Sequence, residues 1–161
     1  MRSRMVFLLS LALVAVPWRS GAGETVTLDI NAAYEVVLRP DVDCRGFRVA
    51  GSGWAVGSPI PQAMVEDHAC ADLATSPGRI TFRSATMTLR STPADRIDIT
   101  YTADADAIPD MNGYLHPFGS FTVTGGAGVF EGVAGSGVFS SVTHPVVGAT
   151  TAHLQGTLTL P

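Results

Sequence analysis

Apolar and polar residues alternate along short runs of this chain, and glycine and proline separate the runs. Near the C-terminus the apolar face of one such run consists of Ala152, Leu154, Leu158 and Leu160. Ile97, Ile99 and Tyr101 alternate with polar residues in the same way. A period of two residues is typical of a strand with one buried face, and turn residues spaced about ten positions apart join many such strands. The sequence therefore predicts an all-β fold.

The run Arg79–Arg90 changes phase in its middle. The apolar residues Ile80 and Phe82 fall on even positions. From Ala85 onward the apolar residues, Met87 and Leu89 included, fall on odd positions. One extra residue must therefore be absorbed at Arg83 or Ser84, and a β-bulge does this. Bulges increase the local twist and help a sheet to curve toward closure.

The N-terminal residues indicate export. Arg2 and Arg4 precede an apolar run from Met5 to Val16, and Ser-Gly-Ala follows at positions 20–22. This order is typical of a secretory signal peptide, and the run is too short to span a bilayer. We expect cleavage after Ala22, which makes residues 1–22 the signal peptide and residues 23–161 a single secreted or periplasmic domain. No other apolar stretch approaches the ~20 residues of a membrane span.

The exported domain is acidic and contains no lysine. Loss of Arg2, Arg4 and Arg19 leaves seven of the ten basic residues against fourteen acidic ones, a balance of −7. The remaining arginines are scattered, so no basic stripe is available for a phosphate backbone. Nucleic acid is therefore not an expected partner.

Cys44 and Cys70 are the two cysteines of the chain. Export favours disulfides, and we expect these two residues to pair. In the chain-entropy model a loop of this length gives a stabilisation of about 3 kcal/mol. The segment Ile60–Leu73 is expected to be a long, partly irregular connection that the disulfide pins. A catalytic pair between a cysteine and the nearby His68 is the alternative.

A glycine-rich stretch marks the second half of the chain. Residues 125–135 read Gly-Gly-Ala-Gly-Val-Phe-Glu-Gly-Val-Ala-Gly, a spacing that fits neither a dinucleotide loop nor a phosphate loop. The stretch resembles the motif of the allene oxide cyclase barrel family and of the related dirigent proteins, and departs from it at Ala127. The matching positions include Gly125, Gly126, Gly128, Phe130, Gly132 and Gly135.

The resemblance implies an eight-stranded antiparallel β-barrel with a largely apolar cavity, frequently assembled as a homotrimer. A barrel of eight strands can enclose one small ligand. An open sandwich with a filled core is the alternative, because strands at this spacing fit either architecture.

Plant members of this family carry a Glu-x-Asn pair on their first strand, and the corresponding residues here are Asp29 and Asn31. The resemblance implies that these two side chains polarise a bound epoxide and hold a water molecule, which makes them the catalytic candidates. If Leu28 and Ile30 pack inward instead, Asp29 and Asn31 face solvent. This second interpretation is the one that we favour from the sequence.

Trp54 and Tyr101 are the aromatic residues that we expect to contact a ligand, and burial of Trp54 in the core is the favoured alternative. The four histidines lack the spacing of a metal site. We therefore expect no metal and no cofactor. Neither Ser52 nor Ser136 completes a nucleophile motif.

These observations lead to three hypotheses. The first is a secreted barrel that binds a small apolar ligand without established catalysis. The second is an isomerase, either a cyclase or a dirigent-like protein, that steers a reactive intermediate inside a dry cavity. The third is an oligomeric interaction module.

Overall fold

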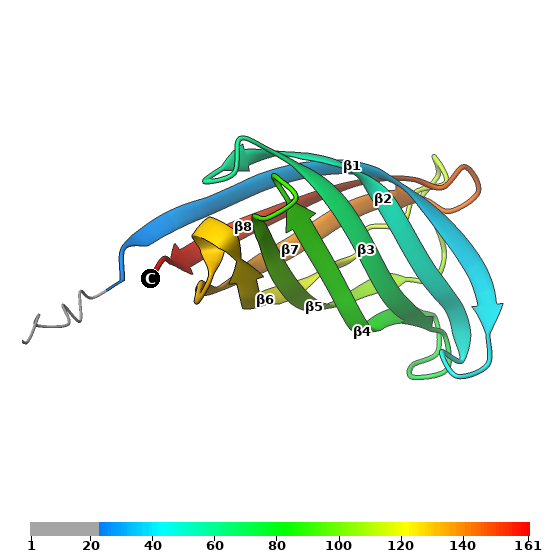
Figure 1. Cartoon of the computed structure of the whole chain (residues 1–161). Coiled ribbons are helices and arrows are strands. Elements are labelled where there is room, and N and C mark those ends of the chain that lie inside the picture. Colours follow the sequence, from blue (N-terminus) through cyan, green and yellow to red (C-terminus); the bar gives the residue numbers. More distant parts are fainter. Residues whose placement is uncertain (1–22) are drawn as a thin grey trace, which may run out of the picture.

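The computed structural model describes residues 23–161, which form a closed barrel of eight antiparallel strands in sequential order (Figure 1). The predicted all-β, eight-stranded barrel is confirmed, and the open sandwich is wrong, because β1 pairs with both β2 and β8. The predicted signal peptide lies outside the described residues. The elements are β1 (Thr25–Asp41), β2 (Gly46–Ser58), β3 (Gln62–Asp72), β4 (Arg79–Arg90), β5 (Arg96–Asp106), β6 (Phe118–Ala127), the single 3-10 turn η1 (Gly128–Phe130), β7 (Ala134–His144) and β8 (Ala149–Thr159).

The alternation in the sequence sets which side chains point into the barrel. Along β8, Leu154 and Leu158 are fully buried, whereas Gln155 and Thr157 between them are exposed. Leu28 and Ile30 of β1 are fully buried as well. Within the described part of the chain, no helix is long and apolar enough to cross a membrane.

The phase change in β4 is a β-bulge, as predicted. Phe82 pairs with Ala103 of β5, and the next pair joins Ala85 to Tyr101, so Arg83 and Ser84 lie opposite one residue. Ser84 has a φ of 50°, in the left-handed region. The bulge lets the apolar residues on both sides of it point into the barrel.

The expectation of an irregular connection over residues 60–73 is wrong, because most of this segment is strand β3. Its inward residues Ala63, Val65, Ala69 and Ala71 are buried and mostly small. Alanine has low strand propensity. The inward Asp67 also breaks the apolar pattern, so the segment does not look like a strand from its sequence. The connection that follows β3 is only residues 73–78.

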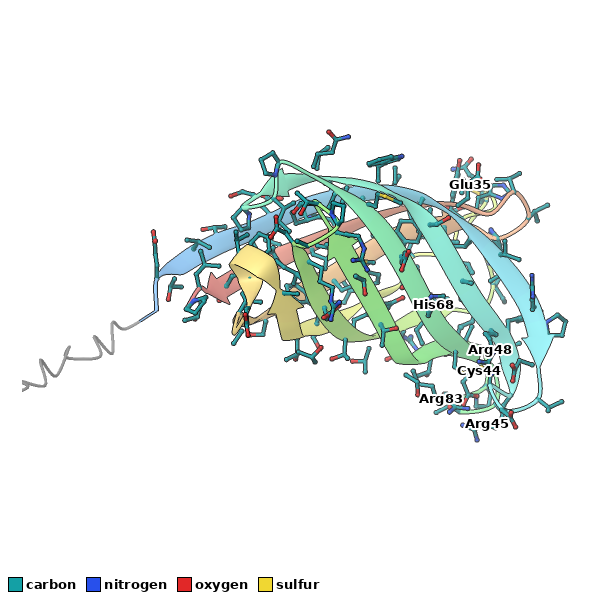
Figure 2. All side chains as sticks on the ribbon, viewed as in Figure 1. Glu35, Cys44, Arg45, Arg48, His68 and Arg83 are labelled. Atoms are coloured by element: carbon teal, nitrogen blue, oxygen red, sulfur yellow. A yellow bond between two sulfur atoms is a disulfide. The ribbon has the colours of Figure 1, made fainter. Side chains whose placement is uncertain are left out.

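The predicted disulfide is present, with 2.02 Å between the sulfur atoms of Cys44 and Cys70. It ties the β1–β2 turn to the outer face of β3. Beside it, the fully buried Asp72 accepts hydrogen bonds from Arg45 and Arg83, with 2.9 Å to each Nε atom. Burial raises the pKa of Asp72, but the Ala74 N–H and the two guanidinium groups outweigh it and hold that pKa well below its usual range. Figure 2 shows Cys44, Arg45 and Arg83 together at one end of the barrel.

The two ends of the barrel differ. The connections 42–45, 73–78, 107–117 and 145–148 lie at one end, which we call the loop end. The opposite end, which we call the glycine end, carries η1 and lies beside the C-terminus (Figure 1). There Gly128 and Gly132 have φ values of 66° and 81°, in the region that favours glycine. The turns that they form bury Phe130 and Val133 against the core.

Candidate functional site

A cavity of about 260 Å³ lies inside the loop end of the barrel. Its wall is mainly apolar and includes Leu38, Phe47, Ile80 and Phe82. The connection 107–117 contributes Pro109, Leu115 and Pro117 to the wall. At the glycine end the interior is filled by large side chains that are at most 1% exposed, among them Leu28, Ile30, Leu89, Ile97, Leu154 and Leu158.

One carboxylate interrupts this apolar wall. Asp67 of β3 points into the barrel, is 2% exposed, and accepts a hydrogen bond of 2.9 Å from the Tyr101 hydroxyl of β5. The Tyr34 hydroxyl of β1 interacts with the same carboxylate. Strands that are distant in the sequence thus bring together an acid and two phenols, which we call the Asp67 cluster.

Glycines of β2 make room for Tyr34. Gly51 pairs with Val36 on one side and with Asp67 on the other. A Cβ atom at Gly51 would lie 2.8 Å from Cδ2 of Tyr34, and one at Gly53 would lie 2.5 Å from its Cα. Both distances are shorter than a carbon–carbon contact allows. Gly51 therefore leaves space for the ring over β2, and Gly53 leaves space for the close approach of the Tyr34 backbone.

Tyr101 is held by packing. Its ring stacks on that of Phe139 of β7, with 4.3 Å between the ring centroids and 22° between the planes. On the other side, Tyr101 pairs with Ala85, the first residue after the β4 bulge. Both tyrosines are 6% exposed. The geometry of the cluster is therefore fixed by the surrounding strands.

Burial determines the protonation states in the cluster. It raises the pKa of Asp67 to about 6, although the hydrogen bonds from Tyr101 and Tyr34 act in the opposite direction. Burial and the nearby carboxylate raise the pKa of both tyrosines well above their usual range. At neutral pH the cluster therefore holds one negative charge and two hydroxyl groups that remain donors.

This arrangement can hold the polar group of a ligand and can accept a proton from it. The other polar residues on the cavity wall are Ser141, Thr143 and Thr150. Among residues 23–161 no group of three or more histidine, cysteine, aspartate or glutamate side chains is placed to bind a metal. Of the residues that line the cavity, none is a histidine, cysteine or arginine.

The structure places one of the predicted ligand-contacting residues in this cavity. Tyr101 lines it, whereas Trp54 lies on the outer face of β2 and is 57% exposed. The favoured interpretation of Trp54 as a core residue is wrong, because its neighbours in register, Ala33 and Met64, also face outward. Trp54 therefore cannot contact a ligand inside the barrel.

The two catalytic candidates lie on the outer face of β1. Leu28 and Ile30 point inward, so Asp29 and Asn31 point away from the cavity, as the favoured interpretation expected. Asp29 is 2.8 Å from Nε2 of His153 on the neighbouring strand β8. The structure does not bring this pair together with Tyr101.

Sequence reasoning missed Asp67 and Tyr34. The signal for Asp67 is its position in the sequence, since it occupies the centre of the alternating series Ala63, Val65, Ala69 and Ala71. A charged residue at an inward position of a strand is a candidate functional residue. The signal was lost because the segment was interpreted as a connection. Nothing in the local sequence distinguishes Tyr34 from an ordinary core tyrosine.

The glycine motif that carries the family resemblance belongs to the glycine end, away from the cavity. No protein-family model matches the chain, and the comparisons with curated proteins and with solved structures give no match either. The family resemblance stays a prediction, and the cavity is the basis for inferring a function.

Proposed function

We propose that this protein binds a small, largely apolar molecule in the cavity at the loop end of its barrel. The observation that supports the proposal is an apolar cavity with one polar cluster on its wall. Binding sites for small molecules are typically concave and apolar, with a few placed polar groups that fix the orientation of the ligand. The Asp67 cluster is such a group.

The volume limits the size of the ligand. A cavity of about 150 Å³ holds benzene, and sites for drug-sized molecules begin at about 300 Å³. At about 260 Å³ the cavity lies between these values. One or two rings, or an aliphatic skeleton of similar size, match this space.

The proposal places binding outside the cytoplasm. The N-terminal residues have the order of a signal peptide. The disulfide between Cys44 and Cys70 is compatible with an oxidising compartment.

Binding can be tested by NMR titration with indole, a soluble bicyclic probe. We expect saturable shifts of the methyl groups of Val36, Val49 and Ile80, which line the cavity. Ala71 lies on the cavity wall between Phe47 and Phe82 in register. The variant Ala71→Phe fills part of the space and should weaken binding at least about tenfold.

The variant Thr157→Phe is the matched control, because Thr157 is exposed on the outer face of β8. It should bind indole as the unchanged protein does. Indole binding that Ala71→Phe leaves intact contradicts the proposed function.

A further inference from the structure

The cavity contains a negative charge, and none of the described residues that line the cavity carries a positive one. Asp67 is flanked in register by Gly51 of β2 and Met87 of β4, and it is faced by Tyr34 of β1 and Tyr101 of β5. His68 is the next residue along β3 and is exposed, outside the residues that line the cavity, and its charge acts to lower the pKa of Asp67 less than burial raises it. The cavity wall carries no arginine and no histidine within the described part of the chain.

The tyrosine hydroxyls stabilise this carboxylate without neutralising it. A carboxylate offers about four lone-pair positions, and each hydroxyl donates one hydrogen bond. A buried charge without a counterion is unfavourable even when hydrogen bonds surround it. The ligand that relieves this cost most completely is one that brings a positive charge.

We infer that the cavity takes a small apolar amine in its protonated form, with the ammonium group against Asp67. This inference rests on the proposed function and assigns the chemical class of its ligand. A hydrogen bond between an ammonium group and a carboxylate is about twice as strong as one between neutral groups. A carboxylic acid of the same skeleton meets charge repulsion at Asp67, and an alcohol leaves the charge uncompensated.

The remainder of the cavity wall suits the same ligand. An ammonium group has three N–H donors. The hydroxyls of Ser141 and Thr150, on the same wall, are available as further acceptors. The stacked rings of Tyr101 and Phe139 provide aromatic faces, which attract cations. The apolar side chains of Phe47 and Phe82 then cover the hydrocarbon part of the ligand.

Three probes with one skeleton test the inference by calorimetry at pH 7.5: 2-naphthylmethylamine, 2-naphthalenemethanol and 2-naphthoate. We expect the amine to bind at least about tenfold more tightly than the alcohol, and naphthoate to bind most weakly. In Asp67→Asn the amine should lose this advantage, while the affinity for the alcohol changes by less than about threefold. Glu66→Gln is the matched control, because Glu66 is exposed on the outer face of the same strand, and it should keep the preference for the amine.

A second measurement requires no variant. At pH 5 Asp67 is mostly protonated, since burial raises its pKa to about 6. The preference for the amine over the alcohol should therefore shrink in the unchanged protein. The preference should return when the same sample is brought back to pH 7.5.

The outcomes separate the two proposals. If indole binds in the cavity but the amine has no advantage over the alcohol, or if Asp67→Asn keeps that advantage, the amine inference is overturned and the proposed function stands. If neither indole nor any of the three naphthyl probes binds, the proposed function is overturned, and the inference is overturned with it.

Discussion

Asp67 lowers the stability of the folded barrel at neutral pH. Its pKa is about 6 in the folded protein, and an aspartate in an unfolded chain ionises near pH 3.9. Between these values the folded state holds a proton that the unfolded state releases. The free energy of unfolding therefore falls as the pH rises through this window, by on the order of 3 kcal/mol from this one group.

The variant Asp67→Asn removes this titration and keeps the shape of the side chain. The melting temperature of the variant minus that of the unchanged protein should be several degrees larger at pH 8 than at pH 4. Thermal unfolding followed by circular dichroism measures both differences. Glu66→Gln, on the outer face, should show no such change with pH. If the difference in melting temperature between Asp67→Asn and the unchanged protein is the same from pH 4 to pH 8, Asp67 does not carry a destabilising buried charge.

Gly51 controls the position of Tyr34 because a Cβ atom there overlaps the tyrosine ring. The variant Gly51→Ala should lower stability by about 1–3 kcal/mol, as overpacking of a core does, and should weaken indole binding. Gly125→Ala is a matched control, since a Cβ atom at Gly125 has no neighbour within 4 Å. Denaturant unfolding compares the two variants. Equal effects of Gly51→Ala and Gly125→Ala contradict the role given to Gly51.

Most strands could be predicted from the alternation of apolar and polar residues. In β4 the same alternation also predicted a β-bulge. The change of parity between Phe82 and Ala85 located the bulge within two residues. Strand β3 could not be found in the same way. Its alanines have weak strand preference, and Asp67 occupies the position where the pattern requires an apolar residue.

The disulfide joins the β1–β2 turn to β3 and does not hold a long loop. The variant Cys44→Ser should therefore lower stability by about 3 kcal/mol, and strand content should remain. Proteolysis should begin in the turns 42–45 and 73–78, next to the lost bond, and not within β2 or β3. Mass spectrometry of limited digests locates the first cuts. An unchanged melting temperature, or first cuts within residues 50–72, contradicts this account.

In the molecule as a whole, the barrel is filled at the glycine end and hollow at the loop end. The family resemblance implied a cavity, but the alternation of the sequence could not place it, because period two shows only which side chains point inward. Whether those side chains fill the interior depends on which of them lie at the same height in the closed barrel. Small residues such as Ala71 and large ones such as Phe47 meet there through pairings that only the register defines.

The outer surface carries exposed apolar side chains as well, among them Trp54, Val56 and Phe118. Asn31 and His153 lie in the same surface groove as these three residues. The homotrimer that the family resemblance implies stays a prediction.

A crystal structure of the protein grown with indole tests the central claim most directly. We expect the probe inside the loop end, with its N–H donating to the Asp67 carboxylate and its ring against Phe139 and Phe82. The tyrosine hydroxyls should still donate to Asp67. A loop end that is packed solid by the protein's own side chains, or indole found only on the outer face near Trp54, contradicts the claim.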